Sequence, residues 1–278
     1  MDVWQADFYR RPLRDVKEQV LWELLICDSK DSFTYSAFCP QQSINTDWLV
    51  EQLRQAAAVR GLPEVVQVFR PQSLNLLATA GEQLGISVTG TRHTIALKHK
   101  LLERAAQYFQ QDNYTGELYN PLALDKPPPV PLPENLWGDR WRFATLPAGN
   151  ILEEFRDRPI PILQMPEFLF PLNLGLASTV PVPGVVIDGG RQSMALAHWL
   201  QDAQPVALNY ISGAPDGLIL EAGLVDRWVV ATFEDQEMTV AAQKYQLRQQ
   251  QSQGLHFLLV QPDDSGMTYT GFWLLQAN

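Results

Sequence analysis

A short basic stretch near the middle of the chain carries the first residues that could do chemistry. Arg92, Lys98, Lys100 and Arg104 lie close together, and only Glu103 opposes their charge there. Lys100 and Arg104 are four residues apart, so on a helix they share a face and can donate charge-assisted hydrogen bonds to phosphate groups. The stretch is therefore a predicted phosphate contact; the alternative is an ordinary solvated helix face, which is common for small charge clusters.

The segment 187–191 is a second candidate, because there the pattern changes from a strand to a helix. Two successive glycines, a helix N-terminus and the guanidinium group of Arg191 could together surround an anion. The segment lacks the Lys-Ser/Thr ending of a phosphate-binding P-loop. A tight turn in which Asp188 caps the following helix explains the same residues.

Catalytic motifs are scarce in this chain, which contains neither G-x-S-x-G nor H-E-x-x-H. Asp188, Glu221 and Asp226 lie at ends of predicted strands and could collect a divalent metal for phosphodiester cleavage, as in restriction-nuclease-like folds. The residues after Glu221 do not supply the lysine that the usual Glu-x-Lys element of such sites contains. Turn and capping roles account for these acids more simply. We therefore predict a protein that is not an enzyme and that has no metal or other cofactor.

Net charge limits where a polyanion could bind. The 278 residues carry a formal charge of -10, and the hydrophobic content of 46% fits a globular protein of roughly two domains. Residues 1–126 hold 13 Lys+Arg against 15 Asp+Glu, whereas residues 127–278 hold 8 against 16. Sequence-independent phosphate binding needs clustered basic residues, so any RNA site must be local. The less acidic N-terminal half is the less repulsive one.

Hydrophobic periodicity predicts a ββαβαβ order in the N-terminal half, followed by a third helix. Asn45 or Thr46 is placed to cap the first helix, and Gly85 to end the second. Cys27 and Cys39 stand in no C-x-x-C motif and are expected to be reduced, buried thiols. The predicted strands are 20–28, 33–39, 64–69 and 86–89, with a turn over 28–32, and the predicted helices are 46–60, 71–84 and 94–109.

Six prolines between residues 121 and 136 predict an extended, semi-rigid connector. The expected domains are thus 1–115 and 141–278, joined by a proline-rich connector over 116–140. Each is expected to be a mixed α/β domain with a mostly antiparallel or mixed sheet and packed helices. In the C-terminal half the predicted strands are 185–187, 206–211, 218–220, 228–233, 255–261 and 267–275, and the predicted helices are 191–200 and 237–253.

Three segments read together resemble one family. They are residues 4–12 (WQADFYRRP), 21–28 (LWELLICD) and 269–275 (YTGFWLL). They resemble the Tab family, RNA-binding translation factors that plant and algal chloroplasts use for photosystem I messages, with relatives across cyanobacteria. Trp273, Leu274 and Leu275 match the tripeptide that closes the family signature, and the resemblance implies RNA binding at that end. Period-2 spacing offers the alternative that this tripeptide is a core strand.

The resemblance implies an RNA-binding protein that promotes translation of photosystem messages and photosystem biogenesis. Single-stranded, A/U-rich RNA suits a chain with little positive charge, because unpaired bases can stack on aromatic rings. The expected site residues are Arg92, Lys98, Lys100, Arg104, Arg191, Trp273, Leu274 and Leu275. Translation or photosystem assembly proteins are expected partners as well.

The sequence is compatible with two other functions. One is an assembly or scaffold protein that uses the apolar, proline-dense segment 159–176, and the other is a degenerate restriction-nuclease-like enzyme. The chain shows no long apolar run for stable membrane insertion and no secretory signal. Because the motif begins at Trp4, a cyanobacterial, cytoplasmic location is expected.

Overall fold

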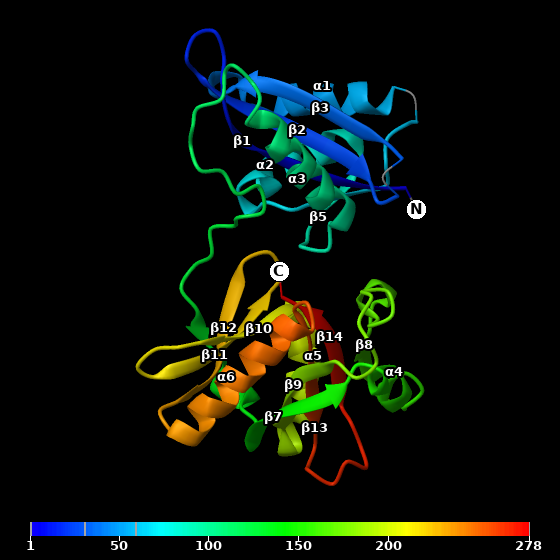
Figure 1. Cartoon of the computed structure of the whole chain (residues 1–278). Coiled ribbons are helices and arrows are strands. Elements are labelled where there is room, and N and C mark those ends of the chain that lie inside the picture. The colour runs from blue at the N-terminus through cyan, green and yellow to red at the C-terminus, as the bar shows by residue number, and fades with distance from the viewer. Residues whose placement is uncertain (1, 31, 59, 278) are drawn as a thin grey trace. The chain divides into compact units, whose positions relative to one another are not determined.

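The computed structural model describes residues 2–30, 32–58 and 60–277. The chain divides into two compact units, Met1–Asp125 and Lys126–Asn278. Each unit is a mixed α and β structure with its own hydrophobic core (Figure 1). The division falls inside the proline-rich segment, whose first part packs on the first unit and whose second part packs on the second.

The first unit is built around a five-stranded sheet of order β3-β2-β1-β4-β5 in its described residues. β1, β2 and β3 are antiparallel neighbours, whereas β4 and β5 run parallel to β1. The helices α1 and α2 pack on one face of this sheet and α3 packs on the other (Figure 1). The elements are β1 (Val3–Arg14), β2 (Val20–Asp28), β3 (Thr34–Pro40), α1 (Thr46–Ala57), β4 (Val65–Val68), α2 (Pro71–Leu84), β5 (Ser87–Gly90) and α3 (Ile95–Tyr108).

The central strand β1 separates an apolar face from a polar face. Trp4, Ala6 and Phe8 enter the core under α1 and α2. The alternate residues Gln5 and Asp7 are also buried, on the side of α3. Alternation is expected along a strand, but here both sets of side chains are inside the protein. β1 was not predicted from the sequence, because a strand buried on both faces lacks a solvent-facing polar period.

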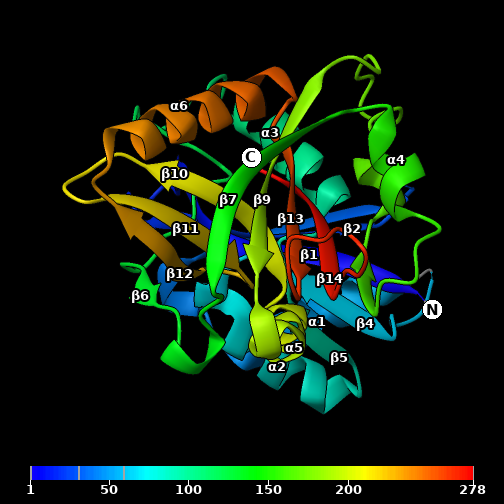
Figure 2. The same cartoon turned by 90° about the horizontal axis from the view of Figure 1, so that it is seen from below.

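The second unit contains two sheets within its described residues, ordered β10-β11-β12-β6 and β7-β9-β13-β14-β8. Helix α6 packs on β9 and β10, and α5 packs against β13 (Figure 2). The elements are β6 (Val130–Pro131), β7 (Arg140–Pro147), α4 (Asn150–Phe155), β8 (Ile162–Gln164), β9 (Pro181–Asp188), α5 (Ser193–Ala203), β10 (Pro205–Ile211), β11 (Asp216–Ala222), β12 (Asp226–Phe233), α6 (Gln236–Gln251), β13 (Leu255–Gln261) and β14 (Gly271–Gln276).

Several local predictions are confirmed in the structure. The Asn45 side chain accepts a hydrogen bond from the backbone N–H of Trp48 at 2.8 Å and so caps α1. α2 begins at Pro71 and ends before Gly85, which has a φ of 70°, the left-handed conformation that glycine adopts without a steric cost. β2 and β3 pair as expected, although Asp31 of their predicted turn lies outside the described residues.

The residues around the prolines contain more regular structure than predicted. β6, β7, α4 and β8 all fall in stretches where the sequence shows no clear period. β6 is only two residues long and pairs in parallel with β12, a short edge position in which prolines are tolerated. The segment 159–176 packs on the second unit, with Ile160, Ile162 and Leu169 buried. In the described residues we find no helix that combines the length and the apolarity needed to cross a membrane.

Candidate nucleic-acid interface

Arg104, one of the predicted phosphate contacts, binds the carboxylate of Glu23 in the same unit. Its guanidinium group donates to Glu23 Oε1 at 2.5 and 3.0 Å and also bonds the Ser36 hydroxyl. Glu23 further accepts from Arg11 at 2.8 Å and from Tyr108. Burial opposes ionisation, yet Arg11, these hydrogen bonds and Arg104 keep the pKa of Glu23 below its ordinary value. Arg104 therefore neutralises a buried carboxylate and has little capacity left for a phosphate.

The other three residues of the basic stretch differ in exposure. Arg92 is buried with 4% of its surface exposed. Lys98 lies over the Phe69 ring with its Nζ 5.7 Å from the ring centre, and burial together with Arg92 lowers its pKa to about 8. Lys100 bonds Glu103 at 3.0 Å. Lys100 and Arg104 thus bind two different acidic residues, Glu103 and Glu23. Lys98 differs from both because its pKa is lowered.

The segment around Arg191 does not have the geometry predicted for an anion site. The backbone N–H groups of Gly189 and Gly190 donate to Gln261 O and Pro262 O at 2.8 and 3.0 Å, so they do not point to an open anion site. Asp188 does not cap α5 either, because it bonds Arg142 at 3.0 and 3.1 Å and Gln261 at 2.8 Å. Arg191 is exposed in a short 3-10 turn before α5.

The C-terminal tripeptide is interior. Trp273, Leu274 and Leu275 have 0%, 2% and 4% of their surface exposed. They belong to β14, which lies between β13 and β8 in the sheet. Trp273 and Leu275 enter the core beside α5, and Leu274 enters the core on the other face of the sheet. In this fold the Trp273 ring presents no face on which a base could stack, which favours the core-strand alternative for the tripeptide.

Of the three acids that could form a nuclease site, Asp188 is separated from the other two, whereas Glu221 and Asp226 lie on the paired strands β11 and β12. Glu221 accepts two hydrogen bonds of 2.8 Å from Lys126. Asp188 belongs to β9 and Glu221 to β11, which are in different sheets. Across the residues that the structure describes, no three His, Cys, Asp or Glu side chains gather in a way that could hold a metal ion. Asp188 and Glu221 therefore act as partners of the neighbouring cations Arg142 and Lys126.

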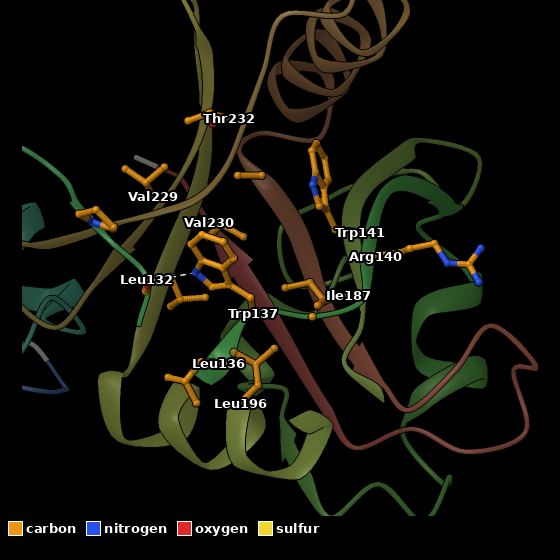
Figure 3. Close-up of a pocket in the computed structure, with 13 residues that line it drawn as sticks. Leu132, Leu136, Trp137, Arg140, Trp141, Ile187, Leu196, Val229, Val230 and Thr232 are labelled. Carbon is orange, nitrogen blue, oxygen red and sulfur yellow. Dashed lines mark hydrogen bonds between the residues drawn. The ribbon is translucent and has the colours of Figure 1, made fainter. Parts of the chain in front are cut away.

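A cavity in the second unit, not singled out from the sequence, is the best candidate for ligand binding (Figure 3). Its volume is about 520 Å³, which falls among the roughly 300–1,000 Å³ typical of ligand pockets. Apolar side chains from β9, α5, β12 and the segment 131–138 form most of its wall. They include Leu132, Leu136, Ile187, Leu196, Val229 and Val230.

Two tryptophans give this cavity aromatic surface. Trp137 is 57% exposed, and its indole N–H donates to the carbonyl of Leu132 at 2.9 Å, which fixes the ring orientation (Figure 3). Trp141 is partly buried, with its ring 5.3 Å from Phe143 and 5.6 Å from Phe233. A large exposed aromatic ring held by a hydrogen bond is a platform on which a flat, unpaired base can stack.

Arginines flank the cavity although the unit is acidic overall. Arg140 lines the cavity wall, and Figure 3 shows its side chain extending away from Trp137. Arg140 and Arg142 lie on the same face of β7, opposite to Trp141, because side chains alternate along a strand. Arg140 pairs in register with Asp188, so Arg191, three residues after Asp188, belongs to the same end of the sheet. Aspartates accompany these arginines, so the positive charge is local.

The sequence contained a signal for this site. Residues 137–142 read Trp-Gly-Asp-Arg-Trp-Arg, an interleaving of aromatic and basic residues that is typical of single-stranded nucleic-acid binding. It was missed because it follows the prolines assigned to a connector. An aromatic cavity beside exposed arginines is the kind of arrangement that single-strand nucleic-acid-binding proteins use.

Comparison with known proteins gives the family. The family RNA-binding protein Tab2/Atab2 matches this chain twice, through its N-terminal domain over residues 3–104 and through its C-terminal domain over residues 119–276. The chain therefore belongs to the Tab2/Atab2 family, as the three sequence segments indicated. The cavity and its arginines lie within the range that matches the C-terminal domain.

Two curated relatives span nearly the whole chain. Protein TAB2 homolog, chloroplastic, from Zea mays is 31% identical over 281 residues, which cover 98% of this chain and 70% of that protein. The protein of the same name from Arabidopsis thaliana is 29% identical over 283 residues, covering 98% and 74%. Among solved structures, the HTLV-2 integrase catalytic core domain with magnesium, in its dimeric form, aligns over 43% of this chain and 79% of that chain, with a TM-score of 0.29 and 12% identity. Likeness at that level supports no argument.

Proposed function

We propose that this protein binds single-stranded, A/U-rich RNA and promotes the translation of photosystem messages, without catalysing a reaction on the RNA. Membership of a family described as RNA-binding supports the RNA part. The chloroplastic relatives from two plants support the photosynthetic context, and a cyanobacterial cytoplasm is the proposed location. A translation or photosystem assembly protein is the proposed second partner.

The observation that carries this proposal is the exposed, hydrogen-bonded Trp137 at an apolar cavity whose wall includes Arg140. Arg191, in the turn that follows the strand paired with Arg140, is proposed as a second cation. Single-strand binders combine stacking on aromatic rings with a few cations along the backbone. Such a site needs little total positive charge, which suits the formal charge of -10. Lys98 and Lys100 in the first unit are proposed as additional phosphate contacts. Arg92 and Arg104 are left to structural roles.

A protein-binding assembly function is a second candidate, because one specific surface favours it. Phe168 and Leu172 are 40% and 83% exposed in the segment that otherwise packs on the core of the second unit. Exposed apolar side chains of this kind are typical of protein contacts. Loss of partner capture, with RNA affinity unchanged, in a Phe168→Ser/Leu172→Ser variant would favour this function.

Fluorescence anisotropy of a labelled, single-stranded A/U-rich RNA tests the RNA proposal. Affinity must fall as salt rises, because phosphate contacts release counterions. The Arg140→Gln/Arg191→Gln variant should bind more weakly, and its log–log salt slope should be shallower by about 1.4, given roughly 0.7 per contact with single strands. Incubating the RNA with magnesium or manganese should leave it uncut; cleavage that requires the protein and the metal would support the nuclease alternative.

An Arg156→Gln/Lys244→Gln variant is the matched control. Both of these cations are exposed in the second unit and neither lines the cavity. This variant removes the same amount of positive charge but changes no cavity residue. It should therefore keep the parental salt slope and nearly the parental affinity. Equal losses in the two double variants would show that only net charge matters, and no binding by the parent would refute the RNA function.

A further inference from the structure

The cavity has an open backbone edge in its wall. β6 pairs with β12 only at Trp228 and Val229, and within the described residues no strand continues along that side of β12. The cavity is lined by the following residues, Val230, Ala231 and Thr232. An unpaired strand edge presents backbone N–H and C=O groups in alternation. These groups can recognise a flat ligand that carries adjacent donors and acceptors.

A β-bulge lies at the same place. The pairing of β11 with β12 shifts between Leu218 and Ile219, where Val230 is the additional residue on β12. Bulges turn a strand locally and are frequent at sheet edges and beside binding sites. The two-residue length of β6 ends the pairing on one side of β12, and at the same place the bulge shifts the register of the β11 pairing on the other side.

The aromatic and cationic groups around this edge lie on different sides. Trp137 lies beside Leu132 and Val230, and the indole nitrogen of Trp141 is on the side of its ring that faces the cavity (Figure 3). The Arg140 side chain extends outward, next to a smaller hollow that it shares with Arg142 and Asp188. An apolar cavity with the Trp141 indole N–H on its inner side and the Arg140 guanidinium group outside matches a nucleotide whose base is inside and whose phosphate is outside.

We propose that this cavity captures one unpaired base of the RNA, stacked on Trp137, with its Watson–Crick edge against the open edge of β12. The inference rests on the proposed RNA function and assigns it a site. It gives a physical reason for single-strand preference, because a base in a duplex already uses its Watson–Crick edge and is stacked on both faces. A polynucleotide rather than a free nucleotide is the expected ligand, because the Arg140 side chain extends away from the cavity, where the backbone of an RNA would continue.

The experiment scans a non-repetitive A/U-rich RNA with one abasic nucleotide at a time. For the parent protein, one position should lose roughly 5- to 150-fold in affinity, the range of one base–aromatic stack. Placing N3-methyluridine at that position should also weaken binding, because the methyl group blocks the Watson–Crick edge. Free AMP or UMP should not displace the RNA at the concentration at which the RNA itself saturates the protein.

Variants of the protein connect this effect to the cavity. Trp137→Ala should bind RNA more weakly and should no longer respond to the abasic position, the non-additivity expected of two groups in contact. Trp137→Phe should recover most of the affinity, since it keeps a stacking face. Phe168→Ala, which removes an exposed aromatic ring of the same unit outside the cavity, should behave as the parent does.

The outcomes separate the inference from the proposed function. If the parent binds RNA but no abasic position lowers its affinity, the inferred base-binding cavity is wrong and the RNA function stands. The same conclusion follows if Trp137→Ala still loses affinity at the position that is sensitive in the parent. Strong competition by AMP or UMP would assign the cavity to a free nucleotide and also overturn the inference. Absence of RNA binding by the parent would remove both, and the first titration would reveal it.

Discussion

Arg70, the residue immediately before α2, and Asp7, in the middle of β1, form a buried ion pair of 2.8 Å in the first unit. The same guanidinium group donates to the backbone carbonyls of Pro121 and Ala123 at 2.5 and 2.7 Å. Arg11 pairs with the other oxygen of Asp7 at 2.8 Å and bonds the Tyr119 hydroxyl. Two buried arginines thus connect the central strands to the start of the proline-rich segment.

Arg70→Met should destabilise the first unit by about 3–5 kcal/mol, because it removes one partner of a buried charge. It should also free the segment that follows Tyr119, since two of its carbonyls lose their donor. Urea unfolding and limited proteolysis around residues 119–125 measure the two effects. Arg14→Met is the control: its pair with Glu18 is 46% and 79% exposed, so the expected cost is below about 1 kcal/mol. Similar costs for both variants would contradict the role of Arg70.

These contacts show what the sequence could and could not predict. Helix caps and stops depend on neighbouring residues, so Asn45 and Gly85 were assigned correctly. The partners of Glu23 include Arg104, which is 81 residues away, and no local pattern encodes such a pairing. A charge cluster at 92–104 therefore resembled a solvent-exposed or RNA-binding surface, whereas folding directs Arg104 to Glu23. The strand β1 was missed because it is buried on both faces, so its residues lack the polar period of a surface strand.

The stability of the second unit should fall in mild acid because of His256. This ring is fully buried; its Nε2 accepts from the Leu208 N–H at 2.8 Å, so its proton lies on Nδ1, 2.7 Å from Gly254 O. Burial lowers the pKa of His256 from 6.5 to about 4, although the bond to Gly254 opposes that change. Between these two values the unfolded chain binds the proton and the folded chain does not, so stability decreases as pH falls, by about 3 kcal/mol in total.

Urea unfolding at about pH 7 and about pH 4.5 measures this loss. His256→Gln should lower stability near neutral pH. It should also flatten the pH dependence, because the variant lacks the buried imidazole group. His198→Gln serves as the control, since His198 is exposed on α5. An unchanged pH dependence in His256→Gln would assign the acid sensitivity to carboxylates.

Replacing Trp273 should lower stability and leave RNA affinity unchanged, whereas replacing Trp137 should lower RNA affinity and leave stability nearly unchanged. Trp273 is inside the core with Leu196 and Tyr245, so Trp273→Ala should cost about 3–5 kcal/mol. The fraction that remains folded should bind RNA as the parent does. Trp137→Ala should leave the melting temperature nearly unchanged and weaken RNA binding. Reduced RNA affinity in a folded Trp273→Leu protein would return the RNA contact to the C-terminal tripeptide.

RNA affinity should depend on pH through Lys98 if this residue contacts a phosphate. Its pKa of about 8 means that much of its charge is lost between about pH 7 and about pH 8.5, so affinity should fall several-fold over that range. Lys98→Gln should be weaker at the lower pH and should show no such fall. Lys98→Arg keeps its charge throughout and should bind equally well at both values.

Unfolding cannot account for that loss of affinity. Because the pKa of Lys98 is lower in the folded chain than its ordinary 10.5, the unfolded chain binds this proton more tightly between the two values. The contribution of Lys98 to stability therefore rises with pH in that window. A melting temperature that stays constant or rises while RNA affinity falls would support a phosphate contact at Lys98. If affinity falls equally in the parent, in Lys98→Gln and in Lys98→Arg, then another group titrates and Lys98 is only part of the first unit's structure.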